Sequence, residues 1–298
     1  MRMPILAAIL AMLSVHAWAE DVVVGSIVYT PIDPGFVPEK PAGTPDDNGI
    51  SFHGGPVLGT NPDSSNVPNI YLIWYGNWAG NTALDIIPDF VFNLGGSPYY
   101  NINTSYTDRI GNPVINAANY GATLFDNYSQ GTALTVARIA TVVRDSIARG
   151  DLPLDYDGVY FVLTSADVAD SGFCRSWCGW HSWMTYQSTP IKFSFIGNPE
   201  RCLNGCARNR VTSPNDNLGA DGMANLIAHE FEETVTDPQV SAWYDNNGQE
   251  NADKCAWTFG TTFTEPNGSI ANMTLGTRDY LIQRNWVNDA GGYCSTSY

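Results

Sequence analysis

The chain has 298 residues, of which 44% are hydrophobic and 15% charged, so it is long and apolar enough to fold. Its 14 basic and 30 acidic residues give a formal net charge of −16, which excludes nucleic acid and anionic lipid surfaces as expected partners. The longest apolar stretch, residues 4–15, is shorter than the ~20 residues that cross a bilayer, so we expect no membrane span.

The N-terminal residues are organised like a secretory signal. Arg2 precedes an apolar core, and residues 17–19 (Ala-Trp-Ala) form a small-x-small cleavage site. We therefore predict a signal peptide over residues 1–19 and a secreted, extracellular protein. The following segment, residues 20–48, is rich in proline and glycine and predicts an extended lead-in, which places the folded domain at residues 49–298.

Strands and a helix alternate along the first part of this domain. Apolar and aromatic runs at residues 69–76 and 158–164 predict two buried strands, and the alternating run 191–196 predicts a third. Between the first two, residues 132–149 carry apolar side chains at helical spacing and end at a glycine, which predicts a helix. The order strand, helix, strand predicts an α/β (α+β) fold, a single domain with a mixed sheet.

A second helix is predicted over residues 220–236, and it carries a group of metal-ligand residue types. His229 and Glu233 lie four residues apart, hence about 40° apart around the axis and about 6 Å along it, so both can reach one ion. The pattern is similar to the zincin-type His-Glu-x-x-His helix, in which the glutamate after the first histidine polarises the attacking water. In this sequence the glutamate that follows the first histidine is Glu230. An exposed acidic helix face is the alternative interpretation.

Because Glu233 replaces the second histidine, zinc is the expected single divalent ion, with manganese and calcium as alternatives. Such a site needs a third ligand from a following element. Glu250 is the residue we predict, with Asp253 on the same face of a short return helix as a partner that orients a ligand. Asp237 is expected in a second layer or as a carboxylate of the turn that ends the helix.

The cysteines and the glycosylation motifs fit an exported protein. We expect three disulfides, with two local ones among the first four cysteines rather than a four-thiolate zinc site. The six cysteines are Cys174, Cys178, Cys202, Cys206, Cys255 and Cys294. Asn-x-Ser/Thr motifs predict glycosylated surface loops at Asn103, Asn127, Asn267 and Asn272 if the host is a eukaryote.

His181 follows Cys178 in a Cys-Gly-Trp-His sequence and is a candidate catalytic residue. As an extra metal ligand, or as a donor to a developing oxyanion, it would complete the site on the second helix. The alternative is a buried, hydrogen-bonded histidine in a loop pinned by a disulfide.

Several sequence blocks occur together in the order of a known family. They are residues 52–57 (Phe-His-Gly-Gly-Pro-Val), 70–78, 172–174, 178–181, 221–223, 227–230 (Ile-Ala-His-Glu), 243–244, 252–255 (Ala-Asp-Lys-Cys) and 293–294. On these blocks the chain resembles the exordium or phosphate-induced family, secreted proteins of plants with relatives in microbes. The resemblance covers most of the mature chain. It implies an extracellular place, an association with growth and cell expansion, and a metal centre.

These observations lead to three hypotheses. The first is a secreted, metallopeptidase-like metal hydrolase, in which Glu230 takes a proton from the water that attacks a peptide carbonyl. The second is a non-catalytic growth, signalling or cell-wall protein with a structural ion. The third is a glycan-binding module that uses Trp177 and Trp180 as exposed platforms. The expected partners are an extracellular protein or peptide or a cell-wall glycan. A monomer is expected, with a Cys255–Cys294 disulfide pinning its C-terminal lobe.

Overall fold

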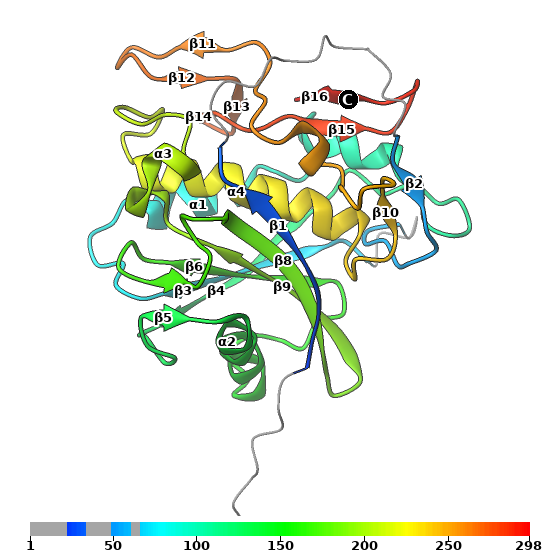
Figure 1. Ribbon diagram of the computed structural model, residues 1–298, viewed down its shortest axis with the longest axis horizontal. Coiled ribbons are helices and arrows are strands. Elements are labelled where there is room, and N and C mark those ends of the chain that lie inside the picture. Colours follow the sequence, from blue (N-terminus) through cyan, green and yellow to red (C-terminus); the bar gives the residue numbers. More distant parts are fainter. Residues whose placement is uncertain (1–22, 34–48, 61–65) are drawn as a thin grey trace, which may run out of the picture.

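A computed structural model of the chain describes residues 23–33, 49–60 and 66–298 (Figure 1). The predicted signal peptide, residues 1–19, and most of the lead-in lie outside the described residues. Within these ranges, no helix combines the length and the apolar character that crossing a bilayer demands.

A six-stranded mixed sheet forms the centre of the molecule. Its strands, in spatial order, are β1 (Val24–Pro31), β8 (Trp177–Tyr186), β9 (Thr189–Ile196), β6 (Gly158–Thr164), β3 (Asn69–Tyr75) and β4 (Asn119–Asp126). The last four strands are mutually parallel, whereas β8 is antiparallel to both of its neighbours. The predicted single α+β domain with a mixed sheet is confirmed, and β3, β6 and β9 are its three predicted strands.

Helices cover both faces of this sheet. Figure 1 shows α2 (Val136–Ala148) on one side and α1 (Ala83–Phe92) and α4 (Leu218–Thr236) on the other. Each of the two predicted helices begins at a side-chain cap: Thr135 Oγ1 accepts from the Arg138 amide at 3.3 Å, and Asn217 Oδ1 accepts from the Ala220 amide at 2.9 Å. The core lies where α1, α2 and α4 meet the sheet.

Short elements complete the chain. Four of them are helical, namely η1 (Tyr100–Ser105), η2 (Pro199–Arg201), α3 (Leu203–Cys206) and η3 (Asp253–Cys255). The others form two-stranded pairs: β2 (Ser51–Phe52) with β10 (Trp243–Tyr244), β5 (Ala133–Leu134) with β7 (Ala169–Asp170), β11 (Phe263–Thr264) with β12 (Ile270–Ala271), β13 (Met273–Leu275) with β14 (Arg278–Tyr280), and β15 (Asn285–Val287) with β16 (Tyr293–Ser295).

The lead-in takes part in the fold. Its residues 24–31 are extended, but as β1 they pair antiparallel with β8 and form one edge of the central sheet. The domain boundary predicted at residue 49 is therefore too late. The pairing joins residues about 150 positions apart in the sequence, which local composition does not reveal.

All six cysteines form disulfides, and the predicted Cys255–Cys294 bridge is among them. The other two are Cys174–Cys202 and Cys178–Cys206. The expectation of local bridges is wrong, because α3 packs onto β8 and each cysteine lies opposite a partner 28 residues away. The two bridges thus join β8, which carries His181, and the turn before it to the segment that precedes α4.

Two of the four glycosylation motifs do not lie in surface loops. Asn103 is in η1 and fully buried. The Asn272 amide nitrogen donates to the backbone carbonyls of Phe259 and Ile282, so it is engaged inside the fold. Asn127 and Asn267 are exposed, although the Asn267 amide nitrogen donates to Ser213 O at 3.0 Å and to Asp216 Oδ1 at 2.7 Å.

Candidate metal centre

Helix α4 presents its acidic residues to the interior. Of its 19 residues, 17 are buried, including His229, Glu230 and Glu233, each at 0% exposure. The alternative of an exposed acidic helix face is therefore wrong. One turn separates His229 from Glu233, and the ring nitrogen Nε2 of His229 lies 3.0 Å from Glu233 Oε1.

Strand β8 supplies His181 to the same site. The loop expected around this histidine is in fact the interior of a strand, and His181 is fully buried there. Gly179 lies two positions earlier and so on the same face. A Cβ atom at Gly179 would come within 3.1 Å of Glu230 Oε1, so the missing side chain makes room for this carboxylate. Thr30 of β1 pairs with Gly179, and its hydroxyl donates to the same Glu230 oxygen.

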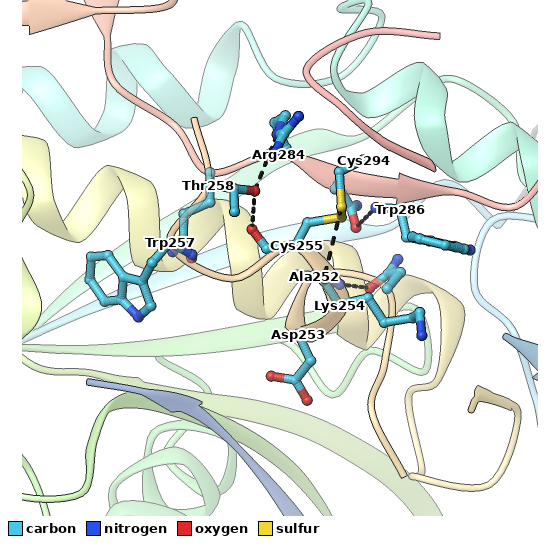
Figure 2. Close-up of a disulfide and its surroundings, with 12 residues drawn as sticks. Ala252, Asp253, Lys254, Cys255, Trp257, Thr258, Arg284, Trp286 and Cys294 are labelled. Atoms are coloured by element: carbon cyan, nitrogen blue, oxygen red, sulfur yellow. Dashed lines mark hydrogen bonds between the residues drawn. A yellow bond between two sulfur atoms is a disulfide. The ribbon is translucent and has the colours of Figure 1, made fainter. Parts of the chain in front are cut away.

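The segment after α4 adds two further carboxylates. The Asp253 amide donates to Glu233 Oε1 at 3.0 Å, which places the first residue of η3 beside the helix. Figure 2 shows the Cys255–Cys294 disulfide on one side of η3 and the Asp253 side chain pointing away from that bridge. Glu250 lies one turn earlier, since its carbonyl accepts from the Lys254 amide at 3.2 Å.

Each histidine faces its own set of carboxylates. Asp253 Oδ1 lies 3.5 Å from His229 Nε2, whereas Glu250 Oε2 lies 2.8 Å from His181 Nε2. Glu233 belongs to both sets, because its second oxygen, Oε2, lies 3.6 Å from His181 Nε2. Two triads result whose donor atoms all lie within 4.8 Å of one another. They are His229, Glu233 and Asp253, and His181, Glu230 and Glu233.

The structure thus brings together all the predicted ligands but distributes them differently. Glu250, expected beside His229, is paired with His181, and Asp253 takes the place beside His229 and Glu233. Asp237 lies at the end of α4, where its Oδ1 accepts from the amides of Ser241 and Ala242 at 2.5 and 2.7 Å. It is a turn carboxylate that also contacts Glu250.

Burial dominates the electrostatics of the cluster. It raises the pKa of Glu233 to about 7 against the opposing effect of His229, and it raises the pKa of Glu230 and Glu250 well above the usual range. Burial also lowers the pKa of His181 to about 3, with repulsion from His229 adding to the effect. His229 differs: burial alone would lower its pKa, but Glu233 and Asp253 raise it well above normal. Without a cation, Glu230 and Glu250 therefore hold protons at neutral pH.

These donors fit a divalent cation. In the described part of the chain, no lysine or arginine forms an ion pair with Glu230, Glu233, Glu250 or Asp253. The second oxygen of Glu230 is buried and accepts no hydrogen bond. Buried carboxylates without a cationic partner are costly, and imidazole with carboxylate is a donor set that suits zinc or manganese.

Comparison with known proteins places the cluster in a family. Residues 50–274 match the phosphate-induced protein 1 conserved region. The chain belongs to this family. It is 29% identical to Protein EXORDIUM-like 5 of Arabidopsis thaliana, covering 80% of this chain and 75% of the relative. It is 29% identical to EXORDIUM-like 3 of the same plant, covering 83% and 82%, and 27% identical to Protein PHOSPHATE-INDUCED 1 of Nicotiana tabacum, covering 59% and 63%.

No solved structure matches the chain, so the likeness of α4 to a zincin helix stays a prediction. The family region contains both histidines and all four carboxylates of the cluster. Thr30, which contacts Glu230, lies outside it.

Sequence reasoning missed two residues at this site. Thr30 was hidden in the lead-in, and Gly179 had no signal beyond the block that contains it. Glu232 is also fully buried but lies outside the cluster, where its Oε2 accepts from Asn285 at 2.7 Å. Its place next to Glu233 in the sequence gave no hint that the two carboxylates have separate surroundings.

Proposed function

We propose that this member of the phosphate-induced family is a secreted, metal-dependent hydrolase of metallopeptidase type. The observation that carries the proposal is the buried cluster of two histidines and four carboxylates, to which no lysine or arginine among the described residues is ion-paired. Three disulfides add support for an exported protein, because such bridges persist in oxidising compartments.

In this proposal His229, Glu233 and Asp253 hold the ion, with zinc as the first choice. A bound ion of this kind polarises a carbonyl and makes a water molecule more acidic. Glu230 follows His229 on the helix and has one oxygen without a hydrogen bond, so it is the group that takes the proton from the attacking water.

His181 has a different task. Because its pKa is lowered to about 3, its imidazole is neutral at physiological pH and donates a hydrogen bond without carrying a charge. A neutral donor beside the reacting carbonyl stabilises the oxygen that gains negative charge in the transition state. Glu250, whose raised pKa keeps it protonated, donates to His181 Nε2 at 2.8 Å and holds the ring in place, so the imidazole proton is on Nδ1, which has no other partner.

The test is hydrolysis of a fluorogenic peptide library by the purified secreted protein. We expect cleavage that stops on chelation and returns with zinc. Glu230→Gln should retain the metal and lose cleavage by at least about 100-fold, the size typical for a general base. Glu232→Gln is the matched control. It changes another buried glutamate of α4, whose carboxylate accepts a hydrogen bond from Asn285 and does not contact the cluster. Cleavage by Glu230→Gln would overturn the mechanism.

One observation favours a second candidate, a non-catalytic extracellular protein with a structural ion. The side chains of His181, His229, Glu233 and Glu250 are at most 1% exposed, and only Asp253, at 14%, reaches solvent appreciably. Structural metal sites are closed by protein ligands in this way. Chelation would then lower stability while no peptide in the library is cleaved.

The glycan-binding hypothesis receives no such support. Trp180, expected as an exposed platform, is fully buried and packs against Phe193 and Phe195. Trp177 is half-buried and its ring lies 4.4 Å from that of Tyr29 on β1. The position of Trp180 within β8 turns its ring into the core.

A further inference from the structure

The two oxygens of Glu233 face different histidines, and this arrangement carries a further inference. We propose that the cluster binds two divalent ions, with Glu233 as the carboxylate that bridges them. One ion would lie between His229 and Asp253, the other between His181, Glu230 and Glu250. The inference rests on the proposed function only in requiring that this cluster binds metal at all. In the doubly loaded protein His181 and Glu230 are ligands of the second ion, and this assignment replaces the oxyanion and proton-acceptor roles proposed for them above.

The bridging role follows from the contacts of Glu233. Oε1 lies 3.0 Å from His229 Nε2, and Oε2 lies 3.6 Å from His181 Nε2. The two triads of donors have Glu233 in common and no other residue. Neither triad contains both histidines, so a single ion held by one triad would leave the other histidine and its carboxylate without a cation.

The separations between donors are close to what each ion requires: two match it and two are a few tenths of an ångström shorter. Two ligands bound tetrahedrally to zinc at about 2.0 to 2.2 Å lie about 3.3 to 3.6 Å from one another. The distances from His229 to Glu233 and Asp253 are 3.0 and 3.5 Å, and those from His181 to Glu250 and Glu233 are 2.8 and 3.6 Å. Both sites thus need only small movements of side-chain ends to close on an ion.

The charges also balance for two ions. Glu230, Glu233, Glu250 and Asp253 together carry four negative charges when ionised, and the two histidines are neutral when they act as ligands. Two divalent cations cancel this charge, whereas with one ion two of the four carboxylates would have to stay protonated to avoid uncompensated buried charge. A second ion takes the place of these protons.

The experiment is to count ions on the full-length secreted protein. The chain is stripped with a chelator, loaded with zinc or Mn²⁺, dialysed, and analysed by elemental analysis and native mass spectrometry. Two ions per chain support the inference, and one ion overturns it while leaving a metal-dependent function intact. No bound ion overturns the proposed function itself, so the two failures are distinguishable.

Variants locate the two sites. Asp253→Asn, at the least buried member of the cluster, should lower the count from two ions to one, and Glu250→Gln should do the same from the other side. Glu232→Gln should keep both ions and serves as the matched control. A count that stays at two in both ligand variants would overturn the assignment.

The bridge has its own spectroscopic readout. Two Mn²⁺ ions joined by one carboxylate are spin-coupled, so the loaded wild type should give the electron paramagnetic resonance spectrum of a coupled pair. Asp253→Asn should give that of an isolated ion. Isolated-ion spectra from the doubly loaded wild type would overturn the bridging role of Glu233. Circular dichroism confirms that each variant is folded before its ions are counted.

Discussion

The two faces of the central sheet are covered by helices of different character. Helix α2 buries one apolar side, formed by residues such as Ile139 and Val143, and exposes Arg138 on the other. Helix α4 is buried nearly all round and carries four ionisable residues in its second half, of which His229 and Glu233 are examples. One face is thus stabilised by apolar burial alone, whereas the other depends on how buried charges are neutralised.

This difference bears on what each helix contributes to stability. A protein gains nothing in stability from buried carboxylates that have no cation, because apolar side chains of similar volume would serve the fold better. Their presence on α4 and their absence from the buried side of α2 support the proposal that α4 carries a metal site.

The largest effect should come from removing metal. Binding to the folded state alone stabilises it, by about 4 kcal/mol when the free ion is a thousandfold above its dissociation constant. Chelation should therefore lower the free energy of unfolding by about this amount, because the carboxylates around His229 and His181 lose their cation. Urea denaturation with and without chelator measures it. Identical curves would remove the basis for a special role of α4.

A change on the other face should be insensitive to metal. Ile139→Ala removes a fully buried side chain from α2 and should cost about 2 to 5 kcal/mol through lost burial and a cavity. The same loss is expected in the chelated and the loaded protein, since the contacts of α2 lie on the opposite side of the sheet. A loss that depends on metal would mean that the two faces are coupled.

The smallest effect should come from β1. Thr30→Val keeps the shape of the side chain and removes the hydroxyl that donates to Glu230. Leaving this buried carboxylate oxygen without its donor should cost about 1 to 3 kcal/mol in the chelated protein. The cost should fall in the loaded protein if an ion neutralises Glu230. Thermal denaturation of the variant and the wild type, each chelated and each loaded, measures the two costs. Thr30→Ser, which keeps the hydroxyl, is the control.

The sequence predicted the elements whose patterns are local. Helix α2 has an apolar stripe, and β3 and β6 are continuous apolar runs between turn signals. Strands β1 and β8 escaped prediction because their identity depends on pairing across the sequence: β1 is an edge strand with one fully buried residue, and β8 begins among cysteines and a glycine typical of loops.

The site was predicted in its composition but not in its arrangement. The i, i+4 spacing of His229 and Glu233 is a helix property and could be read directly. The place of Glu250 beside His181 depends on the antiparallel direction of β8 and on the disulfide that holds η3, which no local pattern encodes. Side chains from three separate segments therefore meet through tertiary packing.

Because β1 forms an edge of the central sheet, a truncated fragment that omits it loses part of the fold. A fragment limited to the homologous region, residues 50–274, would lack both β1 and Cys294. The backbone edge of β8 would then be open to pairing with other chains, and Cys255 would have a free thiol ready for intermolecular exchange. Such a fragment is expected to aggregate during expression. We therefore expect the smallest fragment that folds on its own to extend beyond residues 50–274 at both ends.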